Sequence, residues 1–248
     1  MSQSQRVCGI HVIENLLQHK PQLVRSLWAA RDRSDQRSEA LHELARQAGI
    51  RVQPSQPAAL TRLAATPMHQ GWVADFVPDN LYNEQDLPEL LQALQEPALL
   101  LMLDGVQDPH NLGACLRSAE AAGVQLVLLP RQRAAGLTAV ARRAAAGAAE
   151  LLPICEVVNL ARAMRSCQQQ HCWIIGTSDQ ASQDWYATTP QRRTLLVMGG
   201  EEKGLRQLTM KHCDELAGLP MYGRISSLNV SVATGICLFD LRARLATT

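Results

Sequence analysis

The chain has 248 residues, 46% of them hydrophobic, and a formal net charge of +1, which suits one large or two modest folded domains. It has no run of 18 apolar residues and no signal-peptide core behind its polar start, so we expect a cytoplasmic protein without a membrane-spanning helix. Its seven scattered cysteines form no CxxC pair, which favours reduced thiols over disulfides and argues against a metal site.

Charge is segregated along the chain. The sequence has no Lys or Arg between Leu63 and Leu116 but several acidic residues, whereas the stretch from Arg117 to Arg143 carries five Arg and one Glu. The residues before Arg62 are also basic. Two basic surfaces joined by an acidic connector suit a protein that grips an anionic polymer in two places. An ordinary solvated exterior explains the same pattern, and the sequence leaves both interpretations open.

Residues 1–77 are predicted to form a small α/β domain. Helices are expected at 11–18 and 38–48, ended by Pro21 and Gly49, and strands at 50–53 and 72–77. Trp28 and Trp72 could stack on nucleic-acid bases, but burial in the core is favoured for Trp72. The acidic stretch 78–97, with one short helix at 88–94, is predicted to be a linker.

Residues 98–248 alternate regularly between strand and helix patterns. Asp108 and Asn159 are predicted to cap two of the helices. The alternation predicts a mostly parallel sheet, with ligands at the carboxyl ends of its strands. The strands are expected at 98–103, 124–129, 154–158, 172–176, 194–198 and 215–221, and the helices at 109–123, 138–148, 160–170, from 204, and at 228–245.

The first unusual motif follows the strand at 98–103. It contains Asn111 and Arg117, six residues apart, which share a helix face only approximately. An Arg on an otherwise apolar helix either grips an anionic ligand or forms a structural ion pair, and both remain possible here.

The second motif is Gly199-Gly200-Glu201 and the residues up to Gly204, after the strand at 194–198. Paired glycines let a ligand approach the backbone closely. The motif is not a phosphate-binding loop, and no GxGxxG follows any strand, so triphosphatase and Rossmann dinucleotide chemistry lose support. Glu201 is a candidate helix cap or a candidate site carboxylate.

The third motif is the polar run from Ser226 to Gly235, which leads into the last helix. Hydroxyl and amide side chains at a helix start either cap the helix or bind a polar ligand. Ser226 and Ser227 are therefore candidate caps, and Ser227 and Asn229 are candidate site residues.

Together the three motifs resemble those of the SpoU/TrmH group of RNA ribose 2′-O-methyltransferases, in the SPOUT superfamily. The first is matched by Asn111 to Arg117, the second by Gly199 to Gly204, and the third by Ser227 to Ala233. The likeness extends over the whole chain, including Gly9-Ile10-His11 and His69-Gln70-Gly71. It is closest to the members that act on a guanosine of 23S rRNA.

The resemblance implies a fold and a set of partners. For residues 98–248 it implies an α/β SPOUT-type domain with a mostly parallel sheet, whose C-terminal part forms a deep trefoil knot. For residues 1–77 it implies a small RNA-binding domain. It implies a homodimer that acts on 23S rRNA, in the peptidyl-transferase region. S-adenosyl-L-methionine is expected to be held largely by backbone groups, at Thr177, Gly199, Leu219, Met221 and Leu228.

The resemblance also implies the catalytic set Asn111, Arg117, Glu201, Ser227 and Asn229. A guanidinium is a poor proton acceptor, so we expect Arg117 to grip the adjacent RNA phosphate rather than act as a base. We expect Ser227 and Asn229 to orient the ribose hydroxyl or the cofactor, and Glu201 to fix Arg117 or Asn229. A tRNA ribose methyltransferase of the same group and a catalytically silent rRNA-binding assembly factor are the alternatives.

Overall fold

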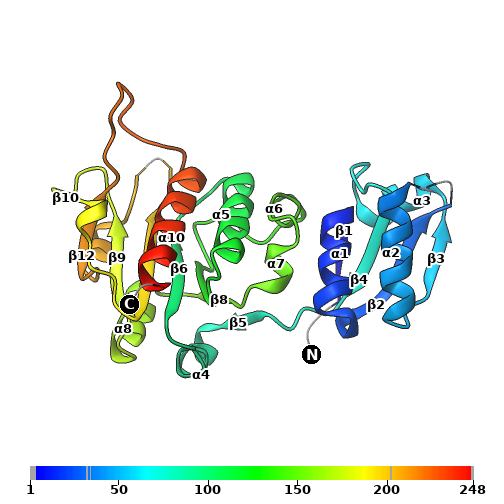
Figure 1. Cartoon of the computed structure of the whole chain (residues 1–248), viewed down its shortest axis with the longest axis horizontal. Coiled ribbons are helices and arrows are strands. Elements are labelled where there is room, and N and C mark those ends of the chain that lie inside the picture. The colour runs from blue at the N-terminus through cyan, green and yellow to red at the C-terminus, as the bar shows by residue number, and fades with distance from the viewer. Residues whose placement is uncertain (1–3, 32, 34, 202, 247–248) are drawn as a thin grey trace. The chain divides into compact units, whose positions relative to one another are not determined.

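The computed structural model describes residues 4–31, 33, 35–201 and 203–246, which form two compact units (Figure 1). The first unit comprises the chain up to Asn80 together with Ala145–Leu151. The second comprises Leu81–Ala144 and the chain from Leu152 onward. None of the helices among the described residues is long and apolar enough to cross a membrane.

The first unit is built on a four-stranded sheet in the order β1-β4-β2-β3, in which only β2 and β3 run parallel. Helices α1 and α2 bury apolar side chains against this sheet, as do Leu27, Trp72 and Phe76 from the strands. The strands are β1 (Gln5–Cys8), β2 (Val24–Ala30), β3 (Val52–Ser55) and β4 (Trp72–Phe76), and the helices are α1 (Ile10–His19), η1 (Pro21–Leu23), α2 (Gln36–Gln47) and α3 (Pro57–Ala64).

Trp72 belongs to the core of this unit, as the sequence predicts. Its side chain is fully buried, its Nε1 donates a hydrogen bond to Ser38 Oγ at 3.2 Å, and its ring meets His42 edge-on. Trp28 is only half-buried, with the Arg6 guanidinium 6.0 Å from its ring centre. Stacking on a nucleic-acid base therefore stays a prediction for Trp28, whereas the buried ring of Trp72 is not accessible to one.

Two short motifs that are far apart in the sequence meet in the first unit. The side-chain carbonyl of Gln70 accepts a hydrogen bond from the backbone N–H of Ile10 at 3.0 Å, at the start of α1. The backbone N–H of Gly9 also donates to the carbonyl of Trp72. These contacts satisfy amides that a helix start leaves without partners, and they tie the start of α1 to the loop before β4.

The second unit contains an eight-stranded, wholly parallel sheet in the order β10-β12-β9-β11-β6-β7-β8-β5. Its central strands are continuous apolar runs, as expected for a sheet covered on both faces. The strands are β5 (Leu81–Asn83), β6 (Ala98–Asp104), β7 (Leu126–Pro130), β8 (Ile154–Val157), β9 (Trp173–Thr177), β10 (Gln183–Asp184), β11 (Arg193–Gly199) and β12 (Glu215–Gly218).

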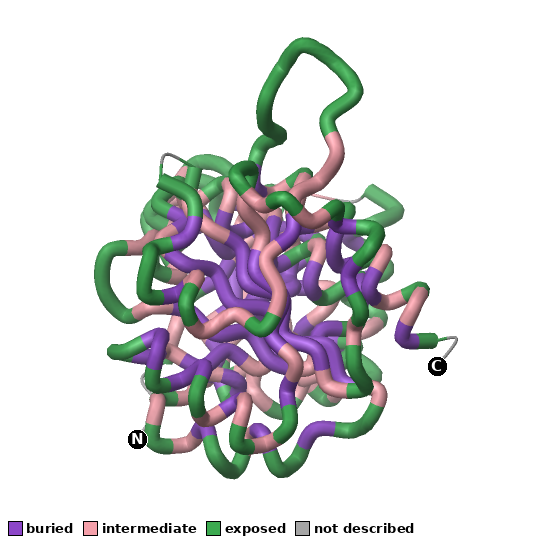
Figure 2. Tube along the Cα trace, turned by 90° about the vertical axis from the view of Figure 1, so that its left-hand side faces the viewer, coloured by how far each residue is buried: buried purple, intermediate pink, exposed green. Residues whose placement is uncertain are grey.

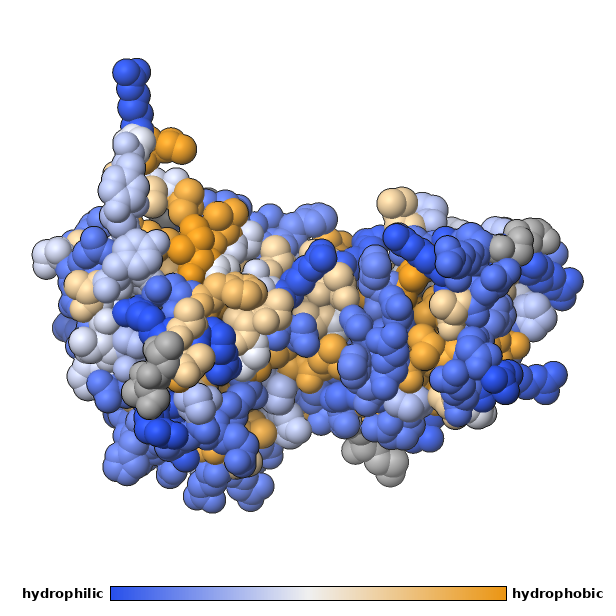
Figure 3. Space-filling view, in the orientation of Figure 1, coloured by the Kyte–Doolittle hydropathy of each residue, from blue (hydrophilic) through white to orange (hydrophobic). Residues whose placement is uncertain are grey.

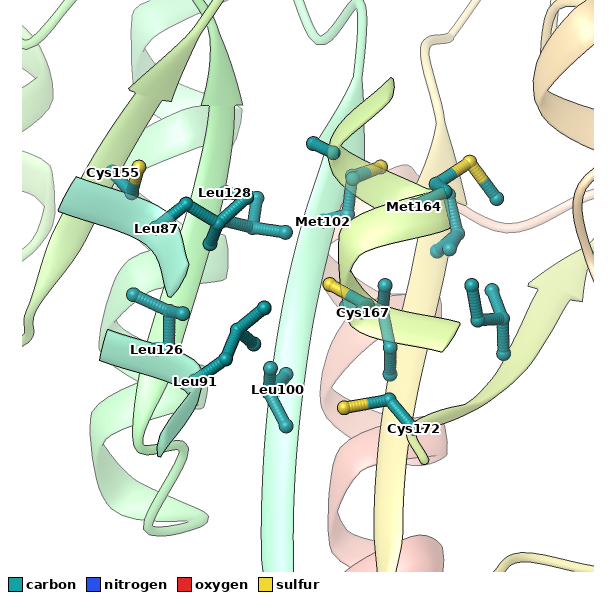
Figure 4. Close-up of a cluster of buried hydrophobic side chains, with 14 of the residues drawn as sticks. Leu87, Leu91, Leu100, Met102, Leu126, Leu128, Cys155, Met164, Cys167 and Cys172 are labelled. Atoms are coloured by element: carbon teal, nitrogen blue, oxygen red, sulfur yellow. The ribbon is translucent and has the colours of Figure 1, made fainter. Parts of the chain in front are cut away.

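Helices cover both faces of this sheet. One face packs against α4 and α8, where Leu91 and Met164 meet Leu100 and Met102 of β6 (Figure 4). On the other face α5 and α10 pack together, and α10 also contacts β11. The helices that follow β5 are η2 (Glu84–Asp86), α4 (Leu87–Gln92), α5 (Pro109–Ala121), α6 (Ala139–Ala144), α7 (Ala148–Leu151), α8 (Leu160–Gln169), η3 (Trp185–Ala187), α9 (Gln207–Met210) and α10 (Val230–Ala246).

Three sequence predictions differ from the structure. The helix expected at 138–148 is two helices, because Ala146 and Gly147 adopt positive φ angles between α6 and α7. The strand expected at 215–221 ends at Gly218, before Pro220. The stretch 78–97 is more than a connection, since it supplies β5 and α4 to the second unit and buries Leu87 and Leu91. The domain boundaries at 77 and 97 stay a prediction.

The segment between β12 and α10 stands apart from the rest of the second unit. Every residue from 221 to 229 is exposed, and this segment projects as a loop in Figures 1 and 2. Residues 219–228 make no backbone hydrogen bond with any other residue that the structure describes. Apolar surface lies at the foot of the loop, beside α10 (Figure 3).

Candidate active site

The three unusual motifs come together at one edge of the large sheet. Strands β6, β11 and β12 are parallel and end at Asp104, Gly199 and Gly218, so the loops that follow them leave from the same edge. The first motif opens α5 after the loop from β6, the second follows β11 directly, and the third lies between β12 and α10. The three motifs therefore lie at the carboxyl ends of parallel strands, where we expect ligands to bind.

A chain of hydrogen bonds links one residue from each motif. Asn111 Nδ2 donates to Glu201 Oε1 at 2.8 Å, and Asn229 Nδ2 donates to Asn111 Oδ1 at 3.0 Å. Glu201 Oε2 also accepts from the backbone N–H of Gln107 at 3.4 Å. Asn111 therefore stands between Glu201 and Asn229, and the expectation that Glu201 fixes Asn229 holds only through Asn111.

Asn229 is also the cap of the last helix. Its Oδ1 accepts from the backbone N–H of Ser231 at 2.9 Å and from Ser231 Oγ at 2.6 Å. This is the bond that an N-cap side chain makes to the second residue of a helix. Neither Ser226 nor Ser227 makes such a bond among the described residues, so the capping residue is Asn229, which bonds to the first motif as well.

An ion pair between a buried carboxylate and a half-exposed arginine closes the second motif against β6. The side chain of Asp104 is fully buried, and its carboxylate accepts from Arg206 Nε at 2.5 Å and from the backbone N–H of Arg206 at 3.1 Å. The carbonyl of Asp104 accepts from Gly200 N–H at 3.0 Å. Burying an unpaired carboxylate is costly, so this residue requires its partner, and the pair holds both ends of the turn between Gly200 and Arg206.

The paired glycines allow the backbone of this turn to pack closely against the backbone of Gly204 and of Gly105. A Cβ on Gly199 would lie 2.2 Å from the carbonyl carbon of Gly204, and a Cβ on Gly200 would lie 2.4 Å from the carbonyl oxygen of Gly105. Side chains at these positions would force the turn away from Asp104. The glycines are thus explained by packing, in addition to any approach of a ligand.

Arg117 lies apart from this hydrogen-bonded chain. Six residues separate it from Asn111, which places the two side chains about 120° apart around α5. Arg117 is exposed, and its side chain makes no hydrogen bond or ion pair with any described residue. The expected contact between Glu201 and Arg117 is therefore absent from the described residues, whereas a guanidinium free to bind an anion is present.

Two of the residues expected to bind the cofactor lie at the ends of strands, and three lie in the segment after β12. Thr177 ends β9, and its hydroxyl lies 3.4 Å from the carbonyl of Val197 on β11. Gly199 ends β11. Leu219, Met221 and Leu228 belong to the segment after β12, in which Met221 and Leu228 are exposed. Ser227 is exposed there as well and makes no hydrogen bond with a described side chain.

Asp104, Arg206 and Gln107 were missed in the sequence analysis. Asp104 was visible as a carboxylate that ends an apolar strand, where a buried charge calls for a partner. Its partner Arg206 is distant in sequence, so only the fold identifies it. Gln107 contributes a backbone group, for which a side-chain pattern carries no signal.

Cys115 lies beneath the site on α5 but is not reactive. It is fully buried, and its thiol donates to Thr234 Oγ1 at 3.5 Å. Burial raises the pKa of Cys115 to about 11, so the thiol stays protonated near neutral pH. No group of three or more His, Cys, Asp or Glu among the described residues could hold a metal ion.

Known proteins similar to this chain share its whole length. Residues 98–239 match the family described as SpoU rRNA Methylase, and residues 6–82 match the family described as RNA 2′-O ribose methyltransferase substrate binding. The 23S rRNA (guanosine-2′-O-)-methyltransferase RlmB of Pseudomonas aeruginosa is 49% identical over 97% of this chain and 97% of its own. The protein of the same name from Escherichia coli strain K12 is 46% identical over 96% of this chain and 97% of its own.

The fold also matches solved structures. The SpoU methyltransferase AviRb from Streptomyces viridochromogenes, in complex with AdoMet, superposes with a TM-score of 0.80. The match covers 99% of this chain and 92% of AviRb at 24% sequence identity. The two chains therefore have the same fold in both units.

Proposed function

Because this chain belongs to the SpoU rRNA methylase family, we propose that it transfers a methyl group from S-adenosylmethionine to the 2′-oxygen of a guanosine ribose in 23S rRNA. The observation that carries the proposal is the chain of hydrogen bonds from Glu201 through Asn111 to Asn229, which joins all three family motifs at one sheet edge. Relatives that align over nearly the whole chain bear the name of this activity.

The residues after β12 suit a cofactor that is held by backbone groups. The N–H and C=O groups of residues 219–228 have no partners among the described backbone, and Leu219, Met221 and Leu228 add apolar side chains. We propose that these groups, with Thr177 and Gly199, hold S-adenosylmethionine. When bound, it supplies an electrophilic methyl group on a positively charged sulfur.

We propose that the hydrogen-bonded chain orients the ribose. Glu201 fixes the amide of Asn111, and Asn111 fixes the amide of Asn229. All three side chains are therefore already ordered before the substrate binds. The hydroxyl of Ser227 is free to bond with the 2′-hydroxyl or with the cofactor. The exposed Arg117 binds the neighbouring phosphate and favours loss of the hydroxyl proton by electrostatic attraction.

Turnover with Arg117 substitutions tests that last role. We expect Arg117→Lys to weaken rRNA binding or turnover, because a lysine cannot reproduce the two parallel bonds of a guanidinium to a phosphate. Nearly full turnover with unchanged RNA affinity would rule out a role for Arg117 as clamp or as base.

We propose a homodimer, supported by an apolar stripe on α10. Val232, Ile236 and Phe239 are exposed at spacings of four and three residues, which places them on one face of the helix. Sedimentation should give twice the mass of the chain for the wild type and a smaller species for Phe239→Asp. A wild-type protein that sediments as a monomer would remove this proposal.

We also propose that the chain is threaded into a trefoil knot after β11. Strand β12 lies beyond β9, yet α10 returns to pack on α5, so the chain must cross back over the carboxyl ends of β9 and β11. A crystal structure with S-adenosylmethionine tests the path of the crossing and the groups that hold the cofactor. A ligand bound elsewhere would contradict the assignment of residues 219–228.

Methyl transfer to purified RNA tests the activity and its alternatives. With radiolabelled S-adenosylmethionine, we expect the label on one guanosine ribose in the peptidyl-transferase region of unmodified 23S rRNA, and none on tRNA. Label on tRNA alone would favour the tRNA enzyme. An absence of S-adenosylmethionine binding by calorimetry would favour a silent assembly factor. We also propose that the protein acts in the cytoplasm, because ribosomes are assembled there.

A further inference from the structure

Two arginines on the loop after β7 have no side-chain partners among the described residues. Arg131 and Arg133 follow the end of β7 at Pro130 and are both exposed. Their side chains make no hydrogen bond or ion pair with any described residue. Other exposed arginines of the second unit, such as Arg162 and Arg192, pair with carboxylates.

The backbone of this loop is nevertheless fixed. The N–H of Arg131 donates to the carbonyl of Val157 at 2.9 Å, and the N–H of Ala135 donates to the carbonyl of Val106 at 2.8 Å. Arg133 itself has a φ of 60°, in the left-handed region that residues with a side chain seldom adopt. Such a conformation persists only where the surroundings impose it, so the loop holds Arg133 in one place.

The loop lies beside the candidate active site. Strands β7, β6 and β11 are neighbours, which places the end of β7 about 10 Å from the end of β11. A Cβ on Gly105 would lie 3.8 Å from the carbonyl oxygen of Arg133, and Gly105 in turn packs against Gly200. The loop after β6 therefore contacts both the arginine loop and the turn that carries Glu201.

No described carboxylate forms an ion pair with either of the two arginines. Asp104 is paired with Arg206, Asp108 accepts from the backbone N–H of His110, and Glu201 accepts from Asn111. Arg131 and Arg133 thus carry two positive charges that no ion pair with a described carboxylate neutralises. An anion such as phosphate suits such a pair, because guanidinium groups bind phosphate through parallel hydrogen bonds.

We propose that Arg131 and Arg133 form a clamp for the rRNA backbone, binding phosphates beside the methylated nucleotide on the β7 side of the site. This inference rests on the proposed function, since it takes rRNA as the substrate. The clamp and Arg117 then hold the RNA strand at two places, one on the β7 loop and one on α5. The clamp positions the strand and carries no base specificity, as is usual for phosphate contacts.

The double variant Arg131→Gln/Arg133→Gln tests the clamp, because glutamine removes the charges and keeps polar side chains. We expect its KM for 23S rRNA to rise about tenfold, with kcat at saturating rRNA and the affinity for S-adenosylmethionine unchanged. The slope of log affinity against log salt should fall by about 1.4, from two lost contacts to a single strand. Restoring charge as Arg131→Lys/Arg133→Lys should recover most of the slope.

The matched control is Arg192→Gln/Lys211→Gln. It removes two exposed charges from segments that precede β11 and β12, at the opposite edge of the sheet. The clamp is overturned if the Arg131 and Arg133 variant binds rRNA with wild-type affinity and salt slope, or if the control variant loses as much. Failure of the proposed function looks different, because the wild-type protein would then methylate no 23S rRNA at all.

Discussion

Two regions at the same sheet edge are held in opposite ways. The loops after β6 and β11 are fixed by the ion pair of the buried Asp104 with Arg206 and by the bond of Asn111 to Glu201. The segment at 221–228, after β12, is exposed and has no backbone hydrogen bonds to described residues. The chain by itself orders the region around Asn111 and Glu201, which we propose binds the ribose. We propose that the cofactor orders the segment after β12.

The difference has an energetic consequence. Fixing a residue's backbone costs about 1–2 kcal/mol of conformational entropy, which the first region offsets on folding through its internal bonds. In the second region, ligand binding must offset that cost. Substitutions in the first region should therefore impair catalysis or stability, and changes in the second should show mainly in cofactor binding.

The largest expected effect is that of Asn111→Ala on turnover. The substitution leaves Glu201 and Asn229 without their common partner, so the side chains that we propose to orient the ribose are no longer ordered before the substrate binds. We expect kcat to fall about 100-fold, equivalent to about 2.7 kcal/mol, in a methyl-transfer assay. Glu120→Ala, an exposed change on the same helix, is the control. Equal turnover in the two variants would mean that the hydrogen-bonded chain is not part of the site.

The next effect is on stability and follows from removing the buried carboxylate. Asp104→Ala leaves Arg206 without its partner, but this arginine is half-exposed and can be solvated in part. We expect the free energy of unfolding to fall by about 2 kcal/mol, measured by urea denaturation. Glu96→Ala breaks exposed ion pairs with Arg192 and Arg193 and should change the midpoint little. Equal midpoints for the two variants would contradict a clamping role for Asp104.

The projecting segment should be sensitive to protease until the cofactor binds. Trypsin should cleave first after Arg224, which is exposed in a segment without backbone hydrogen bonds. S-adenosylmethionine at ten times its Kd should slow this cleavage about tenfold, since it shifts the segment to a bound form. Cleavage at an unchanged rate would show that residues 219–228 do not hold the cofactor. Mass spectrometry of the fragments identifies the cleaved bond.

The smallest expected effect is a pH dependence of the protein's stability that arises from Glu215, at the start of β12. Burial alone would raise the pKa of Glu215, but hydrogen bonds from Trp173, Thr189 and Gln183 outweigh it, so its pKa lies below the ordinary value. Because the pKa of Glu215 is lower in the folded state than in the unfolded state, its ionised carboxylate stabilises the fold. This stabilisation is fully present above the unfolded-state pKa of about 4.3, and it is lost as the pH falls through the folded-state pKa.

The measurement is the melting temperature as a function of pH. The wild-type protein should lose melting temperature on acidification below pH 4.3, and Glu215→Gln should lose less over the same range. Parallel curves would contradict the assignment. Because Glu215 anchors β12 at the end away from the projecting segment, cleavage after Arg224 should not change in this variant.

Much of this site could be predicted from sequence, and the remainder depends on long-range packing. Apolar runs and caps such as Asp108 and Asn159 are local signals, and both side chains do cap their helices. The meeting of the motifs at one edge follows from a parallel sheet. The bonds of Asn111 depend on how α5 is rotated against α10, and the partner of Asp104 depends on a turn about 100 residues away, for which no local pattern exists.

Ribose-methylation mapping of 23S rRNA in cells that lack this protein tests the proposed activity in its natural setting. We expect one guanosine in the peptidyl-transferase region to lose its 2′-O-methyl group. The wild-type gene should restore the group and the Asn111→Ala gene should not. An unchanged 23S rRNA pattern, or full restoration by Asn111→Ala, would contradict the account.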